Sequence, residues 1–140
     1  MNQQGKKRLP ASPEEWLAHA QSDLKLSQLG KDNPEILHEQ ICFHSQQSVE
    51  KALKAVLLFS KIDFPLTHDL EELSYILEGA GIHLPQDILD VGILTPYAVE
   101  ARYPGYWGEL TGQDVDEAIT LSERVLKWAA AYITKETESE

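Results

Sequence analysis

Residues 42–57 place apolar and polar side chains with the period of an α-helix. A step of about 100° per residue aligns four apolar side chains on one face of that helix, namely Val49, Leu53, Val56 and Leu57. The pattern extends in both directions and predicts a helix from Pro34 to about Ser60. A helix of this length would be the spine of the domain.

Polar side chains intrude on the apolar face of this helix. Ser45 and Gln46 fall inside the apolar arc, and Glu50 lies at its edge. A polar side chain that is buried without a partner costs about 1–3 kcal/mol. We therefore expect another polar group to contact Gln46 and Glu50, and Arg102 is the only plausible cation for this role away from the helix itself.

Amphipathic helices are predicted at both ends of the chain. Residues 12–15, Ser-Pro-Glu-Glu, form a capping box with proline at the first helical position, and this first helix should run to about Leu29 and end at Gly30. Residues 111–114 cap the last helix. Its inward positions keep helical spacing throughout and are Val115, Ala118, Ile119, Ser122, Val125, Leu126, Ala129 and Ile133.

Proline, glycine and a threonine cap divide the middle of the chain. Thr67 is expected to cap a third helix, which ends at the Gly-Ala-Gly of residues 79–81. A fourth helix should begin at Pro85, restart or kink at Pro96 and stop at Pro104. No segment predicts a strand, so the expected fold is all-α, an up-and-down helical bundle of about five helices.

The chain of 140 residues has room for one compact domain with a modest core. We expect the domain to comprise residues 12–134. Residues 1–11 are polar and mildly basic, and residues 135–140 are acidic and too polar to pack, so both are predicted to be disordered tails.

The net charge of −11 opposes indiscriminate binding to nucleic acid, because such binding depends on neutralising phosphates. Any RNA contact must therefore be local or made through a partner. The chain has no apolar run long enough for a membrane span and no signal-peptide core, which predicts a cytoplasmic protein without a membrane partner. The single cysteine, Cys42, excludes an internal disulfide and is expected to be a small buried side chain. Metal-ligand motifs are absent as well, so neither a metal nor a cofactor is predicted.

Three motifs, in their order along the chain, closely resemble the HEPN domain family (higher eukaryotes and prokaryotes nucleotide-binding). They are FHSQQSVEKALKA at residues 43–55, THDL at residues 67–70 and EARYPG at residues 100–105. The resemblance covers about residues 12–133 and includes the Asp23-Leu24 pair of the first helix and the amphipathic last helix.

The resemblance implies a helical bundle that forms a homodimer and is encoded beside a minimal nucleotidyltransferase in toxin–antitoxin pairs. Many members of the family are metal-independent ribonucleases, which carry an arginine followed after four to six residues by a histidine. Arg102 fits the arginine, but residues 103–110 contain no histidine. A general acid or base would then have to come from Tyr103, Tyr106, Glu109 or a more distant histidine such as His44 or His68.

The resemblance leaves two roles open for Arg102. It could form a salt bridge to Glu50 or Glu100, or it could clamp a phosphate beside the stacking faces of Tyr103 and Trp107. The aromatic side chains of residues 103–107 could equally cover the end of the bundle. His44 is expected at the surface or an interface, and His68 in a capping or packing role. Lys51 and Lys54 are interpreted as solvated or partner-facing charges.

From these residues we expect a nucleotide- or RNA-associated component of a two-gene toxin–antitoxin-like module, which acts with a minimal nucleotidyltransferase. Two alternatives remain: a metal-independent ribonuclease with an altered catalytic set, and a purely structural dimeric interaction module, which the acidic surface would favour. The expected catalytic residue, if the protein is an enzyme, is Arg102. The expected nucleotide or RNA contacts are Arg102, Tyr103, Tyr106 and Trp107, and the supporting polar network is Gln46, Glu50 and Glu100.

Overall fold

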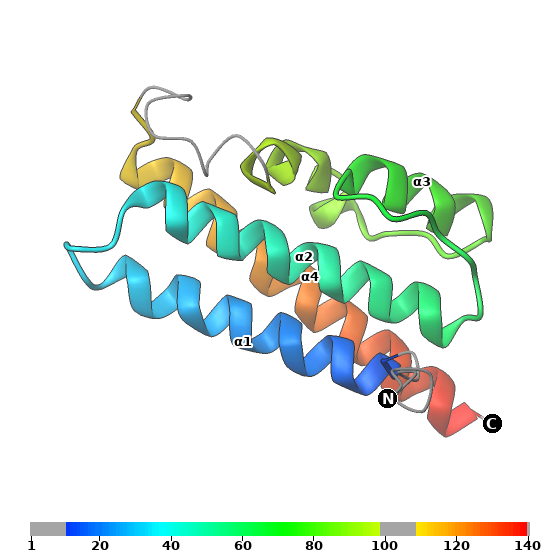
Figure 1. Ribbon diagram of the computed structural model, residues 1–140. Helices are drawn as coiled ribbons and strands as arrows, with labels where there is room; N and C mark the ends of the chain where they lie inside the picture. Colours follow the sequence, from blue (N-terminus) through cyan, green and yellow to red (C-terminus); the bar gives the residue numbers. More distant parts are fainter. Residues whose placement is uncertain (1–10, 99–108, 140) are drawn as a thin grey trace, which may run out of the picture.

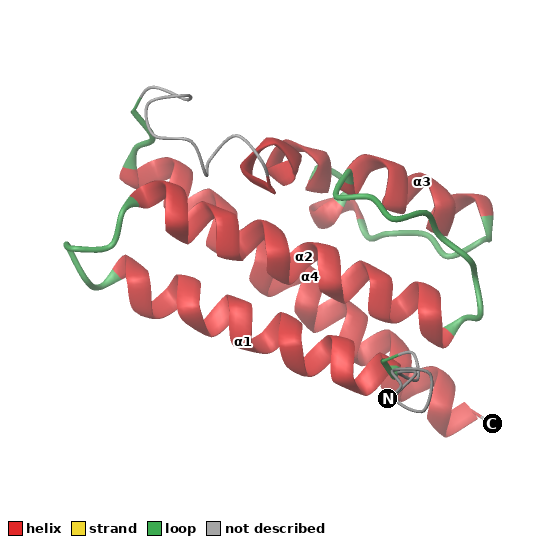
Figure 2. Cartoon of the chain, in the orientation of Figure 1, coloured by secondary structure: helices red, strands yellow, loops and turns green. Residues whose placement is uncertain are grey.

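The computed structural model describes residues 11–98 and 109–139. Within these ranges the elements are helical, with four α-helices and two 3₁₀ helices and no strand (Figure 2). In chain order they are α1 (Pro13–Lys31), α2 (His38–Phe59), α3 (Leu70–Gly79), η2 (Gln86–Ile88), η3 (Val91–Ala98) and α4 (Gly112–Ser139). The prediction of an all-α helical bundle is confirmed.

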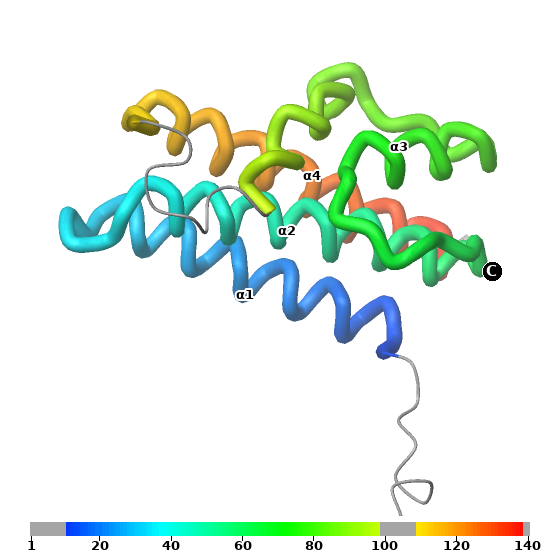
Figure 3. Tube along the Cα trace, turned by 45° about the horizontal axis from the view of Figure 1, so that its top comes forward, coloured from blue at the N-terminus to red at the C-terminus, as the bar shows by residue number. Residues whose placement is uncertain are grey.

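Helix α2 lies at the centre of the bundle and contacts α1, α3, η3 and α4 (Figures 1 and 3). Helix α1 runs antiparallel to α2, while α4 packs along α2 and also touches α1. The segment from α3 to η3 covers the side of α2 that faces away from α1. The predicted spine of the domain is therefore its most enclosed helix.

The apolar faces predicted from helical spacing form the core. All four aligned side chains of α2 are fully buried, as is Cys42. Every inward position expected for the last helix is also buried in α4. These α2 and α4 side chains, together with Leu70, Leu73 and Leu77 of α3, line one continuous interior. Helical periodicity alone was sufficient to identify this core.

The ends of the first two helices differ slightly from the prediction. Helix α1 begins with the expected capping box, in which Ser12 and Glu15 bond each other's backbone N–H, but it continues through Gly30 to Lys31. Helix α2 begins at His38 rather than at Pro34. The reason is a turn at Asn33, whose side-chain oxygen accepts from the Glu35 N–H and whose carbonyl accepts from the Ile36 N–H.

Two predictions for the middle of the chain are wrong. Asp69, not Thr67, caps α3, and its carboxylate accepts from the N–H groups of Glu71 and Glu72. The expected fourth α-helix is replaced by η2 and η3, whose backbone bonds span three residues. Pro96 inside η3 lacks the N–H that a regular helix would need there. The expected stop at Pro104 lies outside the described residues.

Helix α4 also extends beyond the end expected at residue 134. It begins after Thr111, whose hydroxyl accepts from the Asp114 N–H while the Asp114 carboxylate accepts from the Thr111 N–H. It then continues to Ser139, so residues 135–139, expected to be a disordered tail, are helical. Within this last part of the helix, the Thr137 hydroxyl donates a hydrogen bond to the Ile133 carbonyl. Residues 1–10 and residue 140 lie outside the described ranges.

In the described part of the chain, no helix has both the length and the apolar content needed to cross a membrane.

Candidate functional site

A buried carboxylate, Glu50, lies at the centre of a polar network on α2. The side chain of Glu50 is only 5% exposed. It accepts hydrogen bonds from Gln46 Nε2 at 3.1 Å, Lys54 Nζ at 2.8 Å and His68 Nδ1 at 2.9 Å. Gln46 and Lys54 precede and follow Glu50 by one helical turn, whereas His68 comes from the loop before α3. The network therefore links α2 to the α3 side of the bundle.

Lys54 forms an ion pair with Glu50, and it is buried as well, at 6% exposure. Its Nζ lies 5.8 Å from the ring centroid of Trp16 on α1 and 5.9 Å from that of Phe64 in the loop after α2. An ammonium group facing aromatic rings is stabilised by their negative faces. The ion pair is thus enclosed by side chains of α1, of α2 and of the loop that joins α2 to α3.

The neighbours of Glu50 decide its charge state. Burial by itself would raise the pKa of Glu50, but the hydrogen bonds from Lys54, Gln46 and His68 and the charge of Lys54 together hold the pKa below its ordinary value of 4.5. Glu50 is therefore a carboxylate at neutral pH. A buried charge of this kind is tolerated only because its donors are in place.

A second cluster joins α1 to α2 around Asp23, which is 7% exposed. Asp23 Oδ1 lies 2.9 Å from His44 Nδ1, and Asp23 Oδ2 lies 2.6 Å from Lys51 Nζ. One buried carboxylate of α1 therefore holds two side chains of α2. The cluster fixes the register between the two helices and keeps both of its basic groups partly accessible, with side-chain exposures of 31% for His44 and 24% for Lys51.

The two clusters share one chemical feature, an imidazole held by a carboxylate. A carboxylate oxygen accepts, so Nδ1 of His68 and Nδ1 of His44 carry the protons in these contacts. Nε2 is then the ring nitrogen available to a ligand in each histidine. The side chain of His68 is 59% exposed, so it presents the edge of the Glu50 network to solvent. Such a group can donate to a phosphate when protonated, or transfer a proton.

Serine hydroxyls bind α1, α2 and α4 together beside these clusters. Ser45 donates to Ser27 at 3.1 Å, Ser27 donates to the Ile41 carbonyl at 2.9 Å, and Ser122 donates to the Ser45 carbonyl at 2.8 Å. All three serines are fully buried. This chain of hydrogen bonds explains why Ser45 can occupy the apolar arc of α2 without a penalty.

The polar intrusions on α2 have partners. Gln46 and Glu50 do contact other polar groups, as predicted: Lys54, on the same helix, and His68, from the loop before α3, both contact Glu50. The predicted contact with Arg102 falls on a residue that the structure does not describe. The view of Lys54 as a solvated charge is wrong, since Lys54 is buried against Glu50. Lys51 was interpreted in the same way; it forms an ion pair with Asp23 and stays partly accessible.

The remaining predicted site residues are not among those that the structure describes. They are Glu100, Arg102, Tyr103, Tyr106 and Trp107, all of which fall in residues 99–108.

Three site residues were overlooked or undervalued in the sequence. Lys54 follows Glu50 at i,i+4, the spacing of a helical ion pair, so its contact was available from the pattern alone. Asp23 was noted only as part of a family motif. Its contact with Lys51 joins residues 28 positions apart, and no local pattern encodes such a distance. The same applies to His68 and Glu50, which are 18 positions apart.

Comparison with known proteins gives a consistent result. A family model for the HEPN domain matches residues 13–133. The crystal structure of the archaeal HEPN homologue ST0689 superposes with a TM-score of 0.72 at 30% identity, covering 89% of this chain and 99% of that one. TT1696 from Thermus thermophilus shares the fold with a TM-score of 0.72 at 23% identity, over 85% of this chain and 96% of that one. No curated protein matches the chain.

Proposed function

Because the chain belongs to the HEPN domain family, we propose that it is the nucleotide- or RNA-associated component of a two-gene toxin–antitoxin-like module. In this proposal it acts in the cytoplasm, as a homodimer, with a minimal nucleotidyltransferase as its partner. The observation that supports the binding role most directly is the contact between Glu50 and His68. It fixes an exposed imidazole at the edge of a buried ion pair and leaves its Nε2 available to a ligand.

Binding is preferred to catalysis because the histidine of the family's ribonuclease motif is absent after Arg102. In the proposed complex, Arg102 forms a bidentate contact with a phosphate, and Tyr103, Tyr106 and Trp107 offer faces on which a base can stack. The net charge of −11 means that such a contact has to be local, since the surface as a whole repels phosphate.

The binding role is tested by titrating the full-length protein into a fluorescein-labelled single-stranded RNA, and mononucleotides into the protein by calorimetry, both in chelator. We expect Arg102→Ala and His68→Gln each to weaken binding by about tenfold, the effect of losing one charge-assisted contact. His83→Gln is the matched control, because His83 also contacts a glutamate, Glu78 at 2.6 Å, but lies outside the Glu50 network. Equal losses in His68→Gln and His83→Gln would argue against a site at His68.

A ribonuclease with an altered catalytic set is the second candidate, and one observation favours it. His44 and His68 each have Nδ1 on a buried carboxylate, which is how an imidazole is oriented for proton transfer. Incubating the protein with transfer and single-stranded RNAs in chelator decides the matter. Cleavage that is lost in Arg102→Ala and His68→Gln but kept in His83→Gln would establish a metal-independent nuclease, whereas no cleavage by folded wild type would exclude it.

The partner is tested separately by column sizing of the protein alone and after co-expression with an adjacent nucleotidyltransferase. Co-migration supports the two-gene module. A protein that elutes alone in both cases contradicts the partner, and a monomer at all concentrations contradicts the homodimer.

A further inference from the structure

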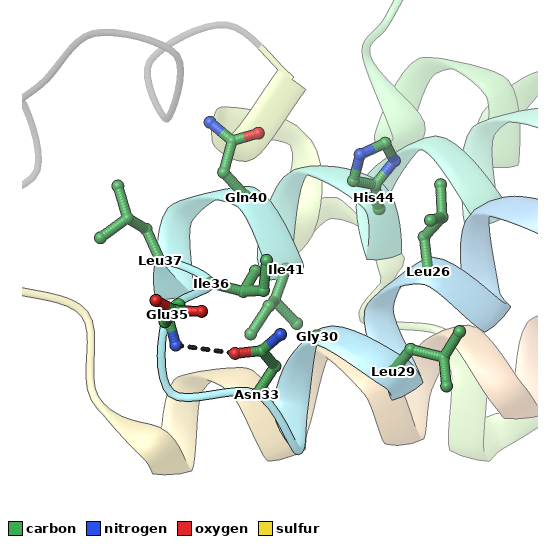
Figure 4. A pocket seen from close by; sticks show the side chains of 10 residues that line it. All are labelled: Leu26, Leu29, Gly30, Asn33, Glu35, Ile36, Leu37, Gln40, Ile41 and His44. Atoms are coloured by element: carbon green, nitrogen blue, oxygen red, sulfur yellow. Dashed lines mark hydrogen bonds between the residues drawn. The ribbon is translucent and has the colours of Figure 1, made fainter.

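An apolar hollow lies where α1 ends and α2 begins (Figure 4). Four large apolar side chains that line it are strongly exposed: Leu26 at 50%, Leu29 at 60%, Ile36 at 40% and Leu37 at 62%. The volume of the hollow is about 480 Å³. Scattered exposed apolar side chains need no explanation, but four around one concave site indicate a surface that another molecule covers.

The hollow is formed by features that fix its shape. Gly30 lies in its floor, where an added Cβ would be 3.0 Å from Ile41 Cγ1 and 3.2 Å from Ile36 Cγ2, so glycine is what lets α1 approach these side chains. Ile41 is 3% exposed and closes the bottom. The turn at Asn33 holds this loop in place, because Asn33 accepts from the Glu35 N–H through its side chain and from the Ile36 N–H through its carbonyl. The hollow is therefore formed before any partner binds.

A second hollow, of about 680 Å³, continues the first, because Ile36 and Leu37 line both. Its far side is made by His38 and Leu110, which are joined by a 2.8 Å contact between His38 Nδ1 and the Leu110 carbonyl. We call the two hollows together the docking groove. It runs from Leu26 past the loop between α1 and α2 to the start of α4.

Apart from His44 and His38, the ionisable side chains of the described residues that line the docking groove are acidic. Glu35 lines the first hollow, and Glu39 and Glu109 line the second, while no lysine or arginine among the described residues lines either. The net charge of the whole chain, −11, has the same sign. Whatever covers the groove must therefore bring apolar side chains together with positive charge.

We propose that the docking groove binds an amphipathic helix of a different protein, with an apolar stripe flanked by lysine or arginine. A helix fits a concave site between two antiparallel helices and would place its i, i+3, i+4 and i+7 side chains against the exposed leucines. The flanking cations would pair with Glu35, Glu39 and Glu109. A second copy of this chain, bound through the same groove, would place its own three glutamates against these three and would be repelled. The proposal goes beyond the nucleotide or RNA site and does not require the partner to be a nucleotidyltransferase.

The test uses the full-length protein and a labelled helical peptide of about 18 residues, with leucines at the helical spacing and lysines beside them. A matched peptide carries glutamate in place of every lysine. Binding is followed by fluorescence anisotropy, and helix formation by circular dichroism. We expect the lysine peptide to bind and the glutamate peptide to bind at least about tenfold more weakly.

Two double variants separate groove binding from general attraction to an acidic protein. The double variant Leu29→Gln with Leu37→Gln keeps every charge but removes two exposed apolar side chains of the docking groove. It should weaken binding of the lysine peptide by about tenfold or more. The control, Leu66→Gln with Leu89→Gln, changes two exposed leucines outside the groove, at 102% and 45% exposure, and should change affinity by less than about twofold. Thermal unfolding checks that both variants fold.

Three results would overturn the proposal. Equal binding of the lysine peptide to wild type and to the groove variant would mean long-range attraction only. Absence of binding by folded wild type up to about 1 mM peptide would mean that the groove takes no such helix. A wild-type dimer that becomes a monomer in the groove variant, by light scattering, would assign the groove to a second copy.

Discussion

Glu50 keeps its charge in the interior because Lys54, Gln46 and His68 all donate to it. Its role is both structural and chemical, since it neutralises a buried lysine and orients an exposed histidine. Removing one member of a buried ion pair destabilises the protein by more than the intact pair stabilises it, because the remaining charge is left in the interior without a partner. The stability of single-residue variants should therefore report directly on this pair.

Glu50→Gln should lower the free energy of unfolding by about 3 kcal/mol, because Lys54 then lies in the core without a carboxylate. Lys54→Met should also destabilise the protein, and the double variant should cost clearly less than the sum of the two single changes. Urea unfolding measures all three. Glu78→Gln, which weakens the solvent-accessible pair with His83 but leaves an oxygen that can accept from the Leu84 N–H, is the control and should cost clearly less stability than Glu50→Gln. Additive effects in the double variant would contradict the coupling.

Ionised Glu50 should also contribute to the pH dependence of folding stability. The folded pKa of Glu50 lies below its ordinary value of 4.5, so ionised Glu50 stabilises the folded state fully above about pH 5, and that contribution is lost as the pH falls through 4.5 and below. The slope of unfolding free energy against pH in this acid range should be shallower in Glu50→Gln than in wild type. An unchanged slope in the variant would show that other carboxylates account for it.

Among the helices, side-chain caps decided where several of them begin. Ser12 begins α1 and Thr111 precedes α4, as the sequence pattern indicated, but the cap of α3 is Asp69 rather than the expected Thr67. Thr67 and Asp69 are both good cap residues, so composition could not choose between them. The structure shows Thr67 Oγ1 accepting from the Asp69 N–H, in the turn that precedes the helix.

Asp69→Ala should therefore cost about 1 kcal/mol, the usual loss for a cap residue, since two N–H groups of the first turn lose their acceptor. Thr67→Ala should cost less, because only one N–H outside the helix is affected. Thermal unfolding of the two variants side by side makes the comparison. A greater loss of stability in Thr67→Ala than in Asp69→Ala would mean that Thr67 is the more important cap of α3.

At the scale of the whole molecule, the described residues pack mainly through α1, α2 and α4. The C-terminal end of α4 extends past the packed core. Tyr132 still packs against Phe59 and Trp128, and Ile133 is 5% exposed, whereas residues 134–138 are exposed. The buried side chains of α4 thus end at Ile133, even though the helix continues to Ser139. In α4, therefore, the helix is longer than the part of it that packs in the core.

Deleting residues 135–140 should shift the melting temperature by no more than about 3 °C, because little apolar surface is removed. Deleting residues 132–140 should lower it clearly more, since Tyr132 and Ile133 are lost from the core and its edge. Calorimetric scans of both truncations provide the measurement. Similar losses in the two would mean that the last turn of α4 contributes packing of its own.

Local sequence was enough to identify most of the helical segments and their buried faces, because the helical period and the capping residues are local. The apolar faces of α2 and α4 were recognised residue by residue, and so was the need of Gln46 and Glu50 for partners. Residues 85–98 were the failure: their prolines signalled a break, but spacing did not distinguish 3₁₀ turns from an interrupted α-helix.

The meeting of distant polar groups, in contrast, depended on how the helices pack. Asp23 contacts His44 and Lys51, and Glu50 contacts His68, across distances in the chain that no periodicity encodes. The docking groove likewise exists only because Gly30 allows α1 to approach Ile41. The physical reason is that the sequence of a helix sets the faces that it offers, whereas the partners of those faces are chosen by the tertiary arrangement.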